Sequence, residues 1–291
     1  TVLTNILVPV DFTLNTEVAI KKAIELAHSP GSIIHLLHVK NPKSTWDILR
    51  GRINFITTPK ENDNNEGMQK LKEWQMAIKE TIPEAEINVY LEEGNVHNKI
   101  VQIAIQMKPQ LIIIAKGNCH KNLKLSSAVY PNRLAKSTAC PVLTIMRESL
   151  HSKIKTIVIP VRSFIPYRKI ELAIAFAKKD RAKIHVVTLQ NKMASWNTNR
   201  NYFIETYLLL KSRLTNTVEY HVLNGNDFPK ATLHYAQHVG ADMILANPWS
   251  ETKIAGISGK HINDLILSSS KLQILSVEPF PLAKIKKRMI N

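Results

Sequence analysis

The residues of this chain that could do chemistry stand just after apolar runs, at the expected ends of buried strands. Asp11 follows the apolar run 5–10, and a polar stretch follows the apolar run 111–115. In a parallel α/β sheet, a loop that leaves the carboxyl end of a strand and enters a helix is where anionic ligands bind. These positions therefore predict a ligand site rather than a set of catalytic groups.

Motifs of catalytic and metal sites are missing from the sequence, which has no nucleophile elbow, HExxH helix, Walker loop or paired-carboxylate spacing. His185 and His221 are scattered along the chain. His234 and His238 are four apart on an expected helix and would share one face, but no carboxylate or cysteine partner is evident beside them. We therefore predict no catalytic residue, no metal site and no enzymatic activity.

The surrounding pattern alternates strand and helix, which predicts an α/β fold with a parallel sheet and right-handed crossovers. Residues 111–143 indicate a buried strand, a polar loop, a helix and a second buried strand, and a second copy of this layout begins at Met243. Val8-Pro9-Val10 recurs as Ile159-Pro160-Val161, and Gly94-Asn95 recurs as Gly225-Asn226. The repeat predicts two tandem domains, 1–148 and 153–279, followed by a basic tail at 280–291.

Composition limits the function classes further. The chain has 291 residues, of which 44% are hydrophobic, enough for two packed cores. No apolar run approaches the ~20 residues that span a bilayer, and no signal-peptide pattern opens the sequence, so we expect a cytoplasmic location. Cys119 and Cys140 fit free thiols in a reducing compartment, with Cys119 the more exposed of the two. The net charge of +16 lies mostly in the second half, where a solvated basic surface, a nucleic acid, an anionic membrane or an acidic protein partner would each account for it.

Three stretches resemble a known family. Asn5-Ile-Leu-Val-Pro-Val-Asp-Phe-Thr, Gly94-Asn95 and Cys140-Pro-Val-Leu-Thr-Ile are similar to the universal stress protein domain, and the resemblance extends over the chain as two copies. It implies two tandem open parallel five-stranded sheets flanked by helices, an adenine nucleotide alpha hydrolase-like, Rossmann-like fold. It also implies dimers, or, in tandem members, pairing of the two domains within one chain.

The resemblance implies a place for ligand contacts as well. Members that bind ATP have an acidic residue after the first strand and a loop of the form G-x-x-G, nine residues, then G-(S/T). Ala115 and Asn118 stand at the first two glycine positions here, and Ala128-Val129 at the last pair. The candidate ligand-binding residues of the first domain are Pro9, Val10, Asp11, Val39, Ala115, Gly117, Asn118, Ser126, Ser127 and Ala128.

The second copy departs from the motif equally. Its glycine positions hold Asn247 and Ser250, Lys260-His261 stand at the last pair, and Arg162 replaces the acidic residue. Glycine lets backbone N–H groups approach a phosphate at positive φ, and alanine there costs about 1 kcal/mol or more. Loss of the Ser/Thr donor costs roughly 1.5–3 kcal/mol more when the bond is charge-assisted. We therefore predict that neither half binds ATP in the family's usual way and that no cofactor is resident.

Two roles remain open for Asp11, which could contact an adenine or ribose group or cap the first helix, and the missing glycines favour the cap. The leading hypothesis is a non-catalytic binding or regulatory module of the stress response, with a homodimer or another protein as partner. The alternative is an ATP-binding protein with slow ATP hydrolysis that uses Asp11, Val39 and a rearranged 117–127 loop in the first domain only.

Overall fold

The computed structural model describes residues 3–27, 30–40, 60–116, 129–149, 153–190, 196–256, 260–266 and 270–279. These form two compact units. The N-terminal unit runs from Leu3 to Ile114, and the C-terminal unit holds Ala115, Lys116 and the elements from Pro131 onward. None of the helices in the described ranges combines the length and the apolar character needed to cross a bilayer.

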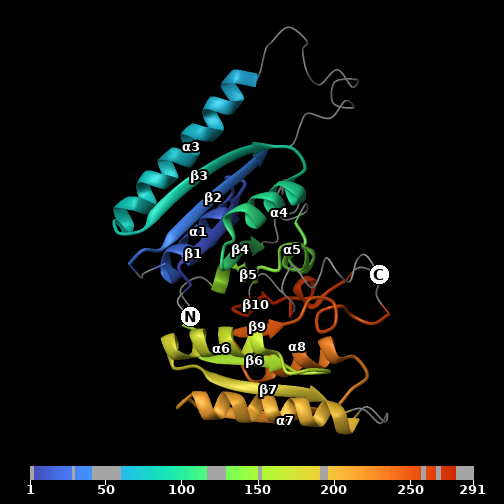
Figure 1. The fold of residues 1–291 in the computed structure, drawn as a ribbon. Helices are drawn as coiled ribbons and strands as arrows, with labels where there is room; N and C mark the ends of the chain where they lie inside the picture. The colour runs from blue at the N-terminus through green and yellow to red at the C-terminus, as the bar shows by residue number, and fades with distance from the viewer. Residues whose placement is uncertain are drawn as a thin grey trace. The chain divides into compact units, whose positions relative to one another are not determined.

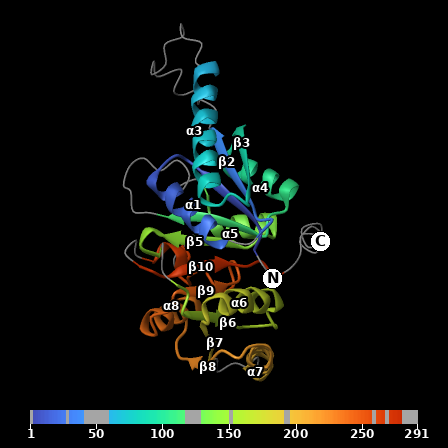
Figure 2. The same cartoon turned by 90° about the vertical axis from the view of Figure 1, so that its left-hand side faces the viewer.

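The N-terminal unit is built on parallel strands in the order β3-β2-β1-β4. Helices α1 and α3 cover one face of this sheet and α4 covers the other, as Figures 1 and 2 show. Right-handed crossovers produce this division, because the chain steps outward from β1 to β3 and then returns to β4. The elements are β1 (Asn5–Val10), α1 (Leu14–Leu26), β2 (Ile33–Lys40), α3 (Lys60–Thr81), β3 (Glu86–Glu93), α4 (Val96–Met107) and β4 (Leu111–Lys116).

The C-terminal unit contains strands in the order β5-β10-β9-β6-β7-β8. All neighbours pair in parallel except β5 and β10. Helices α6 and α7 lie on one face and α8 on the other (Figure 2). The elements are α5 (Pro131–Thr138), β5 (Val142–Met146), η1 (Arg147–Ser149), β6 (Thr156–Pro160), α6 (Tyr167–Asp180), β7 (Lys183–Leu189), α7 (Trp196–Arg213), β8 (Val218–Leu223), α8 (Phe228–His238), β9 (Met243–Ala246), η2 (Ile262–Asp264) and β10 (Gln273–Ser276).

The central strands are apolar on both faces because helices cover both faces. Ile6, Leu7 and Val8 in one unit and Ile157, Val158 in the other are fully buried. The predicted α/β fold, with a mostly parallel sheet flanked by helices, is therefore confirmed.

The two units repeat one local design. The succession β3-β2-β1-β4 in one matches β8-β7-β6-β9 in the other. Gly94 and Gly225 both have φ 141°, a conformation that favours glycine. Asn95 then caps α4 by accepting the Asn98 N–H at 3.1 Å, and Asp227 caps α8 by accepting the Lys230 N–H at 2.9 Å. The parallel is consistent with a duplication, while the domain limits at 148 and 153 stay a prediction.

Strands β5 and β10 pair antiparallel, with Thr144 opposite Ile274. Four buried polar side chains link their surroundings. The amide of Asn132 donates to Asn263 Oδ1 at 3.3 Å and accepts from Ser276 Oγ at 2.8 Å, while the Asn263 amide donates to Thr144 Oγ1 at 3.3 Å. Buried polar groups that satisfy one another in this way fix a unique register.

One expected element is much shorter than predicted. The layout that begins at Met243 predicts a helix before the last strand, whereas the helical element among the described residues between β9 and β10 is η2, a three-residue 3-10 helix. Ser270 lies shortly before β10, and a serine hydroxyl competes with helical hydrogen bonds. Ser270 Oγ accepts the Leu272 N–H at 3.1 Å, which is one such local bond.

Candidate functional site

The candidate site of the N-terminal unit lies at the carboxyl ends of β1 and β2, beside the point where the strand order reverses. Ligands bind at such a point in open α/β sheets. Pro9 and Val10 are buried in β1, and Val39 is buried in β2 with 6% of its surface exposed. His38 Nδ1 lies 2.8 Å from the Val10 carbonyl oxygen, which already has a protein partner. These apolar side chains are therefore packed in the core at the ends of the two strands.

Asp11 is held by the start of α1. Its Oδ1 accepts the Thr13 N–H at 3.2 Å, the Thr13 hydroxyl at 2.6 Å and the Thr16 hydroxyl at 2.6 Å. The Asp11 N–H donates to Thr16 Oγ1 at 3.0 Å. A carboxylate oxygen that accepts an amide two residues further on forms an Asx turn, which fixes the entry of the helix. The N-cap residue of α1 is Thr13, and no side chain caps a helical N–H there, so Asp11 anchors the start of the helix through Thr13 and Thr16.

An aromatic cluster that the sequence did not predict stands next to Asp11. The Phe12 ring lies 4.4 Å from His38 and 5.3 Å from Trp74, between ring centroids, and Lys70 Nζ lies 5.8 Å from its centre. Phe12 has φ 59°, a left-handed conformation that costs a side-chain-bearing residue about 1 kcal/mol or more. The three rings come from a loop, β2 and α3, so no sequence spacing could reveal them. Such faces can stack on a planar ring or a cation.

The remaining predicted contacts belong to β4 and the loop after it. Ala115 lies near the carboxyl end of β4 and is half-buried. Gly117, Asn118, Ser126, Ser127 and Ala128 lie outside the described residues, as does Cys119, so their roles stay predictions. Cys140 is a buried thiol.

The equivalent place in the C-terminal unit is filled by an ion pair. Lys169 Nζ, on α6, donates to the Pro160 carbonyl at the end of β6 and to Glu251 Oε2 at 2.7 Å. The two side chains are 1% and 2% exposed. Burial lowers the pKa of Lys169 and raises the pKa of Glu251, and each partner's charge opposes the other's shift.

Glu251 also occupies the backbone that would hold an anion. It accepts the Asn247 N–H, directly after β9, at 2.7 Å on Oε2, and the Asn247 side-chain amide at 3.2 Å on Oε1. Arg162, at the position of Asp11, donates to the Ser250 carbonyl at 3.3 Å. A carboxylate of the chain itself therefore stands where β6 and β9 diverge, the position at which this fold places a ligand.

Other described residues of this loop also form hydrogen bonds with one another. The Trp249 N–H donates to Thr252 Oγ1 at 2.9 Å, and Thr252 Oγ1 lies 3.0 Å from His261 Nδ1. Asn247 and His261 are buried, whereas Ser250 and Lys260 are exposed. The two glycine positions and the last pair of the expected motif thus belong to a structured loop with its own hydrogen bonds.

The structure also contains a group of possible metal ligands that was not predicted from the sequence. His185 on β7 and Glu219 and His221 on β8 bring possible metal-ligand atoms within 4.8 Å of one another. The two histidines are far apart in the sequence. They become neighbours because β7 pairs with β8 and His185 stands opposite Glu219. Only this strand register could have revealed the group, since no short-range spacing contains it.

Strand succession, crossovers and the loop position define a Rossmann-like α/β protein of the adenine nucleotide alpha hydrolase-like class. The sequence model of the universal stress protein family matches residues 3–145, so this part of the chain belongs to that family. A search of curated proteins found no match.

Solved structures share the fold of nearly the whole chain at low sequence identity. A universal stress protein from Archaeoglobus fulgidus DSM 4304 has a TM-score of 0.67 and 14% identity, covering 95% of this chain and 99% of that one. A putative universal stress protein from Pseudomonas aeruginosa UCBPP-PA14 has a TM-score of 0.58 and 18% identity, covering 99% and 98%. The cytoplasmic domain of a prokaryotic cation chloride cotransporter has a TM-score of 0.55 and 11% identity, covering 95% and 96%.

Proposed function

We propose that this universal stress protein is a non-catalytic binding or regulatory module of the cytoplasmic stress response, and that its C-terminal half takes no nucleotide. The observation that carries the proposal is the buried Lys169–Glu251 pair. A phosphate at the end of β9 would have to displace Glu251 from the Asn247 N–H, or share a buried space with its negative charge. Either arrangement costs about 3–5 kcal/mol, which offsets much of what the phosphate hydrogen bonds would return.

The N-terminal half supports the same proposal less strongly. Asp11 makes three hydrogen bonds to the start of α1 through Oδ1, so that oxygen can contact a ligand only by giving up part of this anchor. The missing glycines add to this cost.

A second candidate function is an adenine nucleotide site in the N-terminal half alone, with slow ATP hydrolysis as its upper limit of activity. The Phe12, His38 and Trp74 cluster favours it, because partly exposed rings beside Asp11 offer stacking faces for a purine.

Titration calorimetry of the full chain with MgATP separates the two candidates. The leading proposal predicts no low-micromolar binding, whereas the second predicts one site per chain. Any binding is assigned with Asp11→Ala, and Asp227→Ala serves as the matched control because it removes a helix-start carboxylate from the other unit. Low-micromolar binding that Asp11→Ala weakens and Asp227→Ala leaves intact would overturn the leading proposal.

We also propose that the two repeats associate within one chain through β5 and β10. The antiparallel ladder and the network around Asn132 support this arrangement. Sedimentation of the full chain tests it, since association within the chain predicts that Asn132→Asp lowers stability without changing the oligomeric state. A concentration-dependent dimer that Asn132→Asp dissociates would instead place this ladder between two chains.

A further inference from the structure

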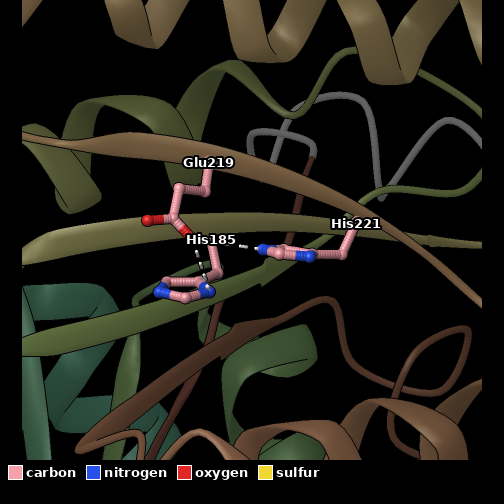
Figure 3. Close-up of side chains that lie close together, drawn as sticks. All are labelled: His185, Glu219 and His221. Carbon is pink, nitrogen blue, oxygen red and sulfur yellow. Dashed lines mark ion pairs between the residues drawn. The ribbon is translucent and has the colours of Figure 1, made fainter.

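The pairing of β7 with β8 places three metal-ligand groups on one face of the C-terminal sheet. His185 stands opposite Glu219 in the parallel register. His221 follows Glu219 by two residues, so its side chain points to the same face of β8. Figure 3 shows dashed lines from one oxygen of the Glu219 carboxylate to a nitrogen of each imidazole ring.

We propose that His185, Glu219 and His221 form a binding site for a divalent transition metal of the Zn²⁺ type, with further positions open to water. Two imidazoles and one carboxylate are a ligand set that Zn²⁺ takes in proteins when a position stays open.

The distances fit such an ion. Zinc binds nitrogen and oxygen at about 2.0–2.2 Å, so two ligand atoms of a tetrahedral site lie about 3.3–3.6 Å apart. Glu219 Oε2 lies 3.4 Å from His221 Nε2 and 3.9 Å from His185 Nδ1, and all three ligand atoms lie within 4.8 Å of one another. Closing the wider gaps requires movement at Glu219 and His221, whose side chains are 40% and 37% exposed.

Two further observations point to a ligand. His221 Nε2 is shielded from solvent yet makes no hydrogen bond with the described residues, its nearest charged neighbour being Glu219. A buried ring nitrogen without a hydrogen bond gains an interaction when it coordinates an ion. His185 is buried, and its burial lowers the pKa of the ring, which keeps it in the neutral form that coordinates metals.

Tyr235, on α8, is a neighbour of the proposed site. It lines an open cavity of about 600 Å³ and places its hydroxyl 2.8 Å from His185 Nδ1. Burial raises the pKa of Tyr235 to about 12, so the phenol keeps its proton. A metal on Nδ1 must displace that hydrogen bond, and Tyr235 therefore competes with the ion.

The N-terminal unit contains an internal comparison. His35 occupies the matching position on β2, but it stands opposite Asn88, and Tyr90 follows two residues later. One metal ligand is thus present where the C-terminal unit has three. The other histidine pair, His234 and His238, lines the cavity without a third described ligand close enough to complete a site.

The test uses the full chain, stripped with a chelator and titrated with Zn²⁺ against a chromophoric competitor. We expect one ion per chain, with affinity at least tenfold lower in His221→Gln and in Glu219→Gln. His35→Gln and His234→Gln are matched controls that should change affinity less than twofold. Tyr235→Phe should raise it several-fold, because a competing hydrogen bond is gone. Circular dichroism checks that each variant is folded.

Substitution of Co²⁺ supplies a readout of the ligands themselves, since imidazole and carboxylate coordination of low symmetry gives an intense visible absorption. That band should be present in the wild type and in His35→Gln and lost in His221→Gln. Absence of stoichiometric Zn²⁺ binding would overturn the proposal. So would binding that His221→Gln leaves unchanged, or binding that His234→Gln removes.

Discussion

The replacement Lys169→Met tests the buried ion pair at the carboxyl ends of β6 and β9. Methionine is close to lysine in length and leaves the stem packing in place, so the change removes mainly the charge. Glu251 would then be 2% exposed with no cation beside it, and it would have to stay charged without a partner or take up a proton, each at a cost in free energy. Breaking a buried pair in this way costs about 3–5 kcal/mol of unfolding free energy.

The double variant Lys169→Met/Glu251→Gln separates the charge effect from packing. Its glutamine carbonyl can still accept the Asn247 N–H, which Glu251 accepts at 2.7 Å. With both charges gone, the loss should shrink to about 1–2 kcal/mol. The single variant Glu251→Gln completes the double-mutant cycle, in which we expect a coupling energy of about 2 kcal/mol or more between the two positions.

Amide hydrogen exchange read by mass spectrometry is the assay, because it reports local opening free energies in each unit separately. The matched control is Lys22→Met in the N-terminal unit. Lys22 is as buried as Lys169, but its partner Glu25, 3.0 Å away, is 36% exposed and can be solvated when the lysine is lost. We expect a loss in β6 and β9 well above that of the control in β1. A cost below about 1 kcal/mol, or single effects that simply add in the double variant, would refute this reasoning.

The direction in which the stability of Lys169→Met changes with pH provides a further check. Burial raises the pKa of Glu251, so near and above the unfolded carboxyl pKa the folded state holds a proton that the unfolded state releases. Stability of the variant therefore falls as pH rises through that window, by at most about 1.4 kcal/mol per pH unit for one proton. The penalty should be smaller at pH 5 than at pH 8.

Two other changes have defined outcomes. Asn132→Ala should lower the free energy of unfolding by about 1–3 kcal/mol, because Asn263 and Ser276 each lose a hydrogen-bond partner inside the C-terminal unit. Thermal unfolding measures this loss, and a melting temperature within about 1 °C of the wild-type value would contradict the role of the network. His35 has its pKa lowered chiefly by burial, with Glu86 opposing, so the unfolded chain binds a proton first and stability falls as pH drops below about 6.5. Urea unfolding at pH 7.5 and 5.5 measures this loss, and His35→Gln should reduce the slope; an unchanged slope would refute the role of His35.

Much of the fold follows from local sequence. The apolar runs around Val8, Ile113 and Val158 predict buried parallel strands, because such strands need apolar side chains on both faces. The glycines before α4 and α8 are position-specific signals with a physical cause, and the structure places both at the positive φ that favours glycine.

The site depends on contacts that sequence cannot supply. Lys169 and Glu251 are 82 residues apart, and each would ordinarily be placed on the surface. His185 and Glu219 become neighbours only through the register of β7 with β8, and the Phe12 cluster only through the packing of α3. Long-range pairing determines both, and a single sequence carries no record of it.

The β5–β10 ladder can form only late in the synthesis of the chain. Asn132 and Ser276, which share a hydrogen bond, are 144 residues apart. At about 5–20 residues per second, a ribosome needs roughly 7–30 s to make the intervening chain. Until then Asn132 and Thr144 have no partner from the second repeat, and β5 has an open edge. An exposed strand edge is a template for pairing with other chains. The nascent first half is therefore the stage at which this protein depends most on protection from aggregation.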